Sequence, residues 1–237
     1  MQIEHAIVLC GGRGSRLGPL GQVVHKALLP VAGAPLISHV LANLVHGGVK
    51  HITILAGHRS DQLKEYLRAA RPDVTSLDFV DEVGAGTAAS VRAVASRFTG
   101  DFIYAHGNVL VPHHAVEKLR VEHAGDPQRS ASFLLSPRLV APTHPRAKLA
   151  ASRITKFTHD GSGEVSSVGL AVLNRQVLAP SATGPENLTT EMSLNEAIAA
   201  GQRVMGTLFD DEWLHLEDLS IYSSIGTEIA APGGGHG

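Results

Sequence analysis

A run of glycines and basic residues follows the first apolar segment of the chain. Gly11-Gly12-Arg13-Gly14-Ser15-Arg16 comes directly after the apolar residues 6–10. Glycines leave backbone N–H groups free to turn toward an anion. The two arginines of the run and the later Lys26 can add charge-assisted hydrogen bonds to phosphate oxygens. This combination indicates a polyphosphate ligand.

The same loop is open to three further interpretations. A dinucleotide-binding fingerprint needs a third glycine where Leu17 stands and an immediate helix, whereas residues 18–21 continue as loop. A Walker A loop needs a Gly-Lys-Ser/Thr tripeptide, which this region lacks. These two interpretations are disfavoured. An ordinary glycine-rich surface loop with exposed basic residues stays open on spacing alone.

Short apolar segments alternate with helical patterns through the first half of the chain. Apolar runs without polar alternation predict strands buried on both faces at residues 6–10, 52–56, 77–80, 102–105 and 131–135. Apolar residues three and four apart predict helices at 35–45, 60–70, 87–97 and 112–123. This alternation predicts a doubly wound α/β fold with a mostly parallel sheet. Ligands of such sheets bind beyond the carboxyl ends of strands, so we expect the loop and Lys26 to form one wall of the main pocket.

The pattern changes from about Pro137, where prolines become closely spaced. Residues 154–157 and 165–173 read as strands separated by a turn at 160–163, which predicts a β-hairpin excursion in the C-terminal half. A helix at 189–200, a strand at 204–209 and a helix at 217–224 complete the predicted elements. We expect a single domain over residues 1–229 and a flexible, glycine-rich tail over 230–237.

Composition argues against several classes of function. The 237 residues carry 20 basic and 22 acidic side chains, and the net charge of −2 offers no overall positive field for nucleic acid or an anionic membrane. No apolar stretch approaches the roughly 20 residues that span a bilayer. The single cysteine, Cys10, cannot form an internal disulfide. We therefore expect a cytoplasmic protein that binds neither nucleic acid nor membrane, and a homo-oligomer is compatible with the sequence.

The glycine-rich segment and the one that follows it resemble the N-terminal signature of sugar-phosphate nucleotidyltransferases, a family that includes glucose-1-phosphate thymidylyltransferases. That signature is G-G-x-G-x-R-L-x-P-L, a spacer, and P-K-x-L-L-P-V-x-G-x-P-L-I. Here residues 11–20 read GGRGSRLGPL and residues 25–37 read HKALLPVAGAPLI. Residues 82–90 are similar to the family's E-x-x-x-G-T-A segment, although a helix capped by Thr87 accounts for them equally well. Residues 165–173 weakly resemble a strand on the sugar side of the pocket.

The resemblance implies a Rossmann-like enzyme that joins a nucleoside triphosphate to a phosphorylated small molecule, with a sugar 1-phosphate as the expected acceptor, and releases pyrophosphate. It implies Mg²⁺ on the phosphates, with Mn²⁺ as the alternative, and catalytic roles for Arg16 and Lys26. The implied nucleotide-binding residues are Gly11, Gly12, Arg13, Gly14, Ser15, Arg16, Lys26, Gly86 and Thr87. The implied acceptor-binding residues are Gly107, Asn108 and Gly169, and the implied metal positions are Asn108 and His215.

The chain departs from the family pattern at several of these positions. Asn108 and His215 stand where the family has metal-binding aspartates, and neither an amide nor an imidazole is a preferred magnesium ligand. Residues 159–161 replace the family's E-K-P, whose lysine contacts the sugar phosphate. His25 replaces the proline before Lys26. Two expected carboxylates and one expected lysine are therefore missing.

Two functional interpretations remain open. The first is an active transferase whose metal is held chiefly by the triphosphate, helped by a carboxylate such as Glu217, Asp210 or Asp211, or a softer metal that bridges Asn108 and His215. The second is a catalytically degenerate nucleotide-binding homologue that acts as a sensor or as a partner subunit. In either case we expect Asn108 and His215 to face each other across the pocket floor.

Overall fold

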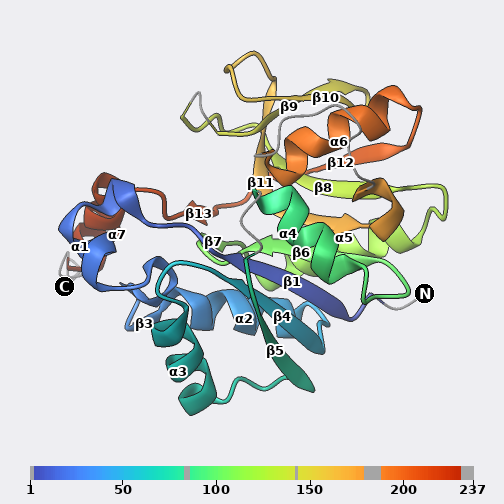
Figure 1. Ribbon diagram of the computed structural model, residues 1–237. Coiled ribbons are helices and arrows are strands. Elements are labelled where there is room, and N and C mark those ends of the chain that lie inside the picture. Colours follow the sequence, from blue (N-terminus) through green and yellow to red (C-terminus); the bar gives the residue numbers. More distant parts are fainter. Residues whose placement is uncertain (1–2, 83–85, 142–143, 179–187, 231–237) are drawn as a thin grey trace, which may run out of the picture.

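A nine-stranded sheet forms the centre of the protein. The computed structural model describes residues 3–82, 86–141, 144–178 and 188–230. The sheet strands are β1 (His5–Cys10), β4 (His51–Ala56), β5 (Ser76–Asp81), β6 (Phe102–His106), β8 (Ala131–Ser136), β9 (Arg146–Ala150), β10 (Arg153–Thr158), β11 (Val165–Leu173) and β12 (Val204–Leu208). They lie in the order β5-β4-β1-β6-β11-β8-β12-β10-β9 (Figure 1).

The sheet is parallel in its N-terminal half and mixed beyond it. β1 pairs in parallel with β4 and β6, and β4 pairs in parallel with β5. β11 runs antiparallel to both of its neighbours, β6 and β8, whereas β12 is again parallel to β8. The expected α/β fold class is confirmed, and each antiparallel pairing of the nine-stranded sheet involves β10 or β11.

Helices cover both faces of the sheet because the side chains of its strands alternate between two cores. In β1, Ala6, Val8 and Cys10 belong to one core, whereas Ile7 and Leu9 belong to the other. The helices of the first core are α2 (Leu36–His46), α3 (Ser60–Ala70) and α5 (His113–Ala124), and those of the second are α4 (Gly86–Ala95) and α6 (Thr190–Ala199). Burial of each large apolar side chain contributes about 1.5–3 kcal/mol, which is why both faces need a helical layer.

Short elements connect the strands and helices of these layers. They are η1 (Ser15–Leu17), α1 (Pro19–Val23), η2 (Lys26–Leu28), β2 (Pro30–Val31), β3 (Ala34–Pro35), β7 (Val109–Leu110), η3 (Arg175–Leu178), β13 (Leu214–His215) and α7 (Leu219–Ala230).

The predicted strands and helices of the first half are present, with ends within two residues of those expected. Pro35 and Pro112 are the N-cap residues of α2 and α5. The last helix begins two residues after its predicted start, at Leu219, and continues to Ala230. The rest of the predicted tail, residues 231–237, lies outside the described residues.

The two strands of the predicted hairpin pair with a third strand, β9, rather than with each other. β10 and β11 do not pair across residues 160–163; instead both pair with β9, where Phe157 and Val165 each stand opposite Ala147. β9 and β10 join through a tight turn at Ala151, whose φ is +53°. β9 was not predicted from the sequence, because Pro145 precedes it and its residues, Arg-Ala-Lys-Leu-Ala, include none of the β-branched and aromatic types that are typical of strands.

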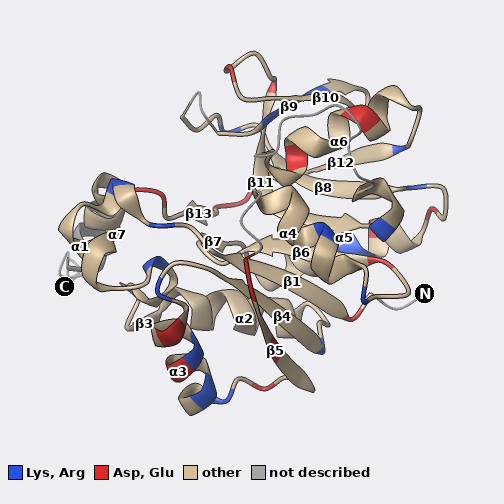
Figure 2. Cartoon of the chain, viewed as in Figure 1, with Lys and Arg blue, Asp and Glu red and all other residues tan. Residues whose placement is uncertain are grey.

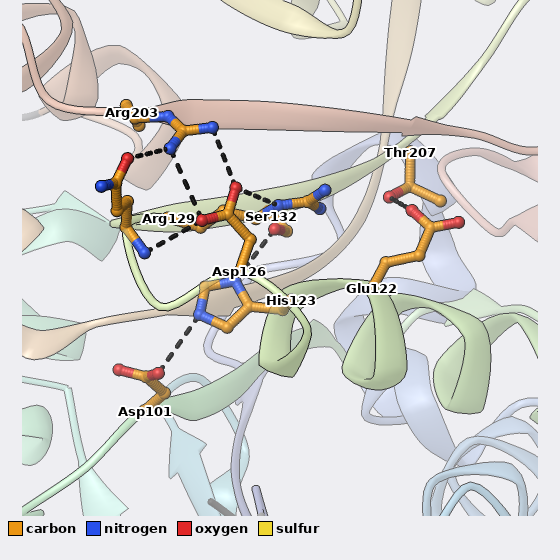
Figure 3. A network of polar contacts seen from close by, with 9 residues as sticks. Asp101, Glu122, His123, Asp126, Arg129, Ser132, Arg203 and Thr207 are labelled. Atoms are coloured by element: carbon orange, nitrogen blue, oxygen red, sulfur yellow. Dashed lines mark hydrogen bonds and ion pairs between the residues drawn. The ribbon is translucent and has the colours of Figure 1, made fainter.

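A polar network ties α5 to the second half of the sheet (Figure 3). The buried ring of His123 lies 2.9 Å from Ser132 Oγ on β8 and 3.2 Å from a carboxylate oxygen of Asp101. Beyond the end of the helix, Arg203 donates to Asp126 at 2.9 Å. The contacts of His123 satisfy polar groups that would otherwise be buried without partners, so we interpret the network as structural.

Charged residues of both signs are distributed over the chain, and α3 carries acidic and basic residues together (Figure 2). Of the helices that the structure describes, none combines the length with the apolar character that a membrane-spanning segment needs.

Candidate functional site

Three parallel strands end together at the edge where the glycine-rich loop lies. Cys10, the last residue of β1, stands opposite Ala56 of β4, and Leu9 stands opposite His106 of β6. A glycine follows each of these strands, so the backbone can turn sharply at the same edge. Open α/β sheets bind ligands in this position, which makes it the candidate site.

A cavity of about 170 Å³ opens at this edge. Six of the residues expected from the sequence line it together: Gly11, Gly12, Lys26, Thr87, Gly107 and Asn108. The remaining lining residues are Leu9, Cys10, His25, Ala27, Glu82 and His106. Arg13, Gly14, Ser15, Arg16 and Gly86 lie outside this lining. The structure thus places the loop glycines, one predicted cation and the start of α4 around one space.

The loop approaches the Glu82 side chain closely at Gly11. A side chain at position 11 would occupy the space that the Glu82 carboxyl group fills, and a Cβ at Gly57 would lie 2.7 Å from a Glu82 oxygen. Burial raises the pKa of Glu82. Glu82 is the first residue of the segment that resembles E-x-x-x-G-T-A, and we predicted no role for it from the sequence. Residues 83–85 of that segment lie outside the described residues.

His25 fixes the backbone that presents Lys26 to the cavity. Its ring Nε2 lies 2.8 Å from the backbone carbonyl oxygen of Cys10, and its Nδ1 accepts a hydrogen bond from the Ala27 N–H at 3.1 Å. Because a carbonyl oxygen only accepts, the proton of the neutral ring is on Nε2. Burial lowers the pKa of His25 and also that of Lys26, whose ammonium the charge of Glu217 partly stabilises. The histidine that replaces the family's proline therefore caps η2 and joins it to the end of β1.

Arg16 forms an ion pair with Glu217. Arg16 belongs to η1, and Glu217 lies between β13 and α7, so the pair joins segments 201 residues apart in sequence (Figure 1). The Arg16 side chain is 60% exposed and that of Glu217 is 19% exposed. Arg16 is therefore accessible at the rim of the site, but in this state its guanidinium is engaged by a carboxylate.

A larger cavity of about 760 Å³ lies beside β13. Its lining includes Arg138, Trp213, His215 and Glu217. The Arg138 guanidinium lies over the Trp213 ring at 4.6 Å from the centroid and donates to the Trp213 carbonyl oxygen at 2.6 Å. Neither Lys26 nor the glycine-rich loop lines this cavity. We expected Lys26 and the loop to form one wall of the main pocket. That expectation is wrong for the larger cavity, which the segment after β12 encloses, because Lys26 and the loop glycines line the smaller cavity instead.

Asn108 and His215 lie on adjacent segments but line different cavities. β7 and β13 pair antiparallel with His215 opposite Val109, and the Asn108 side-chain amide donates to the Leu216 carbonyl oxygen at 2.9 Å. Asn108 lines the smaller cavity and His215 the larger one. Asn108 has only its side-chain carbonyl oxygen to offer as a ligand, and His215 has only a ring nitrogen. Mg²⁺ prefers a shell made entirely of oxygen ligands. These two residues do not fit a magnesium ion.

Neutral histidines surround the inner end of the site. Burial lowers the pKa of His215 to about 2 and that of His106 to about 3, and in each case nearby His144 adds to the effect. The Tyr104 hydroxyl lies 2.6 Å from His106 Nε2. At neutral pH these rings are uncharged, so they bind through hydrogen bonds or lone pairs rather than as cations.

Gly169, which the resemblance places on the acceptor side, lies behind His106. Its φ of +82° favours glycine, and a Cβ there would lie 3.1 Å from His106 Cγ. Gly169 does not itself line the cavity that contains Lys26.

On the same strand, the Ser167 hydroxyl donates a hydrogen bond at 3.4 Å to the buried carboxyl group of Glu191. Burial raises the pKa of this carboxyl group.

A family comparison decides between the interpretations of this loop. The model of the nucleotidyl transferase family matches residues 5–216, which include β1, the glycine-rich loop, Lys26 and β13. The chain belongs to the nucleotidyl transferase family. The resemblance noted in the sequence is thereby confirmed at the level of the family, which favours it over the dinucleotide-binding and Walker A interpretations of the loop.

Curated relatives of this nucleotidyl transferase include proteins named bifunctional protein GlmU. The one from Clavibacter sepedonicus is 28% identical over 245 residues, which cover 95% of this chain and 49% of that protein. The one from Methanococcus maripaludis is 28% identical over 120 residues, covering 50% of this chain and 28% of that protein. The chain spans half or less of the length of these relatives.

Solved structures with the same fold cover nearly the whole chain. The inositol-1-phosphate CTP transferase from T. maritima has a TM-score of 0.79 at 19% identity and covers 97% of each chain. A glucose-1-phosphate thymidylyltransferase from Bacillus anthracis, described as putative in its name, has a TM-score of 0.81 at 18% identity and covers 98% of this chain and 97% of that one. At these identities the likeness establishes the fold.

Proposed function

We propose that this nucleotidyl transferase joins a nucleoside triphosphate to a phosphorylated small molecule, with a sugar 1-phosphate as the expected acceptor, and releases pyrophosphate. The observation that carries the proposal is the cavity at the carboxyl edge of β1, β4 and β6. There, Lys26 and the glycines after β1 line the same space as Thr87 at the start of α4. Backbone N–H groups and a partly desolvated ammonium form a suitable environment for a polyphosphate.

The proposed reaction is an in-line displacement at phosphorus. A phosphate oxygen of the acceptor forms a bond to the α-phosphorus, the bond from that phosphorus to the bridging oxygen of the β-phosphate breaks, and pyrophosphate leaves with that oxygen. The attacking oxygen is already anionic near neutral pH, so no general base is required. The protein's task is to position two anions and to offset their charge.

Lys26 and Arg16 supply that charge in the proposal. Lys26 is held by the His25 cap and faces the cavity, where low solvent exposure strengthens its interaction with phosphate oxygens. Arg16 at the rim must exchange Glu217 for the triphosphate before it can contribute. Arg13 and Gly86 are adjacent in sequence to the lining residues Gly12 and Thr87. Together with Gly14 and Ser15, which follow Arg13 in the loop, they are proposed to contact the nucleotide.

A specific observation also favours the alternative of a degenerate binder. The two positions expected to carry metal-binding carboxylates are Asn108 and His215, and the Asn108 amide is engaged by a backbone carbonyl. A protein that binds the nucleotide without transfer would serve as a sensor or as the partner of an active subunit. The two functions differ in one measurable respect, because only the transferase consumes the triphosphate.

The test is the release of pyrophosphate by the purified protein. Each of the four common nucleoside triphosphates is offered with a panel of sugar phosphates and other phosphorylated acceptors, in parallel with Mg²⁺ and Mn²⁺. The proposal expects release that depends on one class of acceptor and that Lys26→Met abolishes. Lys50→Met is the matched control, because the exposed Lys50 pairs with Glu4 at the opposite edge of the sheet. Tight triphosphate binding without release under any of these conditions would instead support the sensor.

A further inference from the structure

Three potential metal ligands converge beside the larger cavity. His144, His215 and Glu217 each present one ligand atom, and these atoms all lie within 4.8 Å of one another. His215 and Glu217 line the cavity, whereas His144 is buried behind them with its ring 4.9 Å from that of His215. The three residues come from two distant parts of the chain: His144 precedes β9, and the other two end β13 and follow it.

The ring of His144 makes the kind of hydrogen bond that metal-binding histidines typically make. Its Nε2 lies 2.6 Å from the backbone carbonyl oxygen of Ser167. A carbonyl oxygen cannot donate, so Nε2 carries the proton and donates it, which leaves the Nδ1 lone pair available. Metal ligands of this type usually donate their second ring N–H to a carbonyl or carboxylate, which fixes the tautomer and the ring orientation.

We propose that His144, His215 and Glu217 bind one divalent transition metal of the zinc or cobalt class. Two imidazole nitrogens and one carboxylate suit these metals, whereas Mg²⁺ prefers oxygen ligands throughout. Ligands held about 2.1 Å from one ion lie about 3–4.2 Å apart, so small side-chain rotations bring these three donors into range. Three protein ligands leave a coordination position open toward the cavity.

This site differs from the magnesium site that the resemblance implies. There, one ligand follows β6 at position 108. Here, the second ligand beside His215 is His144, which comes from the segment before β9. The proposal therefore explains why His215 is compatible with a metal although Asn108 is not, since the partner of His215 is a second imidazole. No pattern in the sequence indicates His144 as a ligand.

Charge around the site predicts that metal and polyphosphate bind cooperatively. Arg16 pairs with Glu217, and Lys26 also interacts with the Glu217 charge. The positive charges of Arg16 and Lys26 repel a nearby metal dication unless a bound anion neutralises them. This coupling rests on the proposed function, because it assumes that a polyphosphate occupies the loop, whereas the metal site itself does not depend on transfer activity.

The experiment measures Co²⁺ binding to the full chain by titration calorimetry and by the visible absorption of the bound ion. It is run with and without pyrophosphate, and Mg²⁺ is titrated in parallel. The variants are His215→Ala, His144→Ala and Glu217→Gln. His114→Ala is the matched control, because His114 is an exposed histidine that pairs with a carboxylate, Asp211, away from the three ligands. Should His144→Ala fail to fold, the other two variants test the same site.

We expect one Co²⁺ per chain, bound more tightly than Mg²⁺ and tightened further by pyrophosphate. Loss of either histidine should weaken Co²⁺ binding by about 100-fold, and His114→Ala should leave it unchanged. Absence of Co²⁺ binding with and without pyrophosphate, or equal binding by all variants, would overturn the proposal.

The results also separate this inference from the proposed function. Co²⁺ binding through these ligands in a protein that never releases pyrophosphate would leave the metal site standing and refute the transferase. Transfer with Mg²⁺ combined with Co²⁺ binding that His144→Ala and His215→Ala leave unchanged would refute the metal site and leave the transferase.

Discussion

Arg16 at the rim of the glycine-rich loop is ion-paired with Glu217, the residue that lies two positions beyond β13. The pair connects the two ends of the chain across the candidate site. Because Arg16 is largely exposed, water screens the interaction, and its contribution to stability is at most about 1 kcal/mol. The pair therefore matters chiefly for which anion the guanidinium binds.

Glu217→Gln is expected to tighten triphosphate binding by up to about fivefold when transition metals are chelated, since it releases Arg16 from its carboxylate partner. Stability should change little. Calorimetric titration with a nucleoside triphosphate and EDTA measures the effect. Glu212→Gln is the control, because it removes an equal charge from the same segment without an Arg16 contact. Equal tightening in both variants would show a general charge effect and contradict the prediction.

Lys26→Met is expected to raise the dissociation constant of the triphosphate by about 10- to 100-fold, the cost of losing a hydrogen bond to a charged group. The free energy of unfolding should stay constant or increase, because burial disfavours the charge of Lys26 in the free protein. Triphosphate titration and denaturant unfolding of the same samples measure the two effects. Triphosphate affinity equal to that of the wild type would remove Lys26 from the site.

The two adjacent glycines of the loop should respond differently to alanine. Gly11→Ala places a methyl group where the Glu82 carboxyl lies, so the flexible Glu82 side chain must move aside, which should cost less than about 1 kcal/mol of stability but change the cavity that Glu82 lines and weaken triphosphate binding. Gly12→Ala meets no atom within 4 Å and should change the free energy of unfolding by less than about 0.5 kcal/mol. Triphosphate titration and denaturant unfolding of the two variants compare them directly, and wild-type triphosphate affinity in both variants would contradict the packing of Glu82 on the loop.

Acid is expected to destabilise the protein partly through His25. Burial lowers the pKa of His25 in the folded state, so below about pH 6.5 the unfolded state binds the proton more readily than the folded state. Stability therefore falls as the pH falls through this range, by up to about 1.4 kcal/mol per pH unit for one histidine. His25→Asn should flatten the curve of unfolding free energy against pH between about 7.5 and 5. If the curve for His25→Asn is as steep as that of the wild type, protonation of His25 does not contribute to the acid destabilisation.

The sequence predicted the parts of the fold that depend on local pattern. Continuous apolar runs such as residues 6–10 identify buried parallel strands, and the glycine-rich loop identifies their carboxyl edge. Contacts between distant segments were not predictable: nothing in the sequence indicates that Glu217 meets Arg16 or that His144 approaches His215. β9 was missed because a strand with few β-branched residues after a proline resembles a loop. The role of His25 was also missed, since its two ring hydrogen bonds depend on the end of β1 lying beside it.

The most direct test of the proposed transfer follows the phosphorus atoms of the triphosphate. The purified chain is incubated with the preferred acceptor and with triphosphate labelled either at the α- or at the γ-phosphate, and the products are separated. The account predicts that the α-label appears in a nucleotide joined to the acceptor and the γ-label in pyrophosphate, with both transfers lost in Lys26→Met. Release of the γ-label as inorganic phosphate, or recovery of both labels in unchanged triphosphate with every acceptor tried, would contradict it.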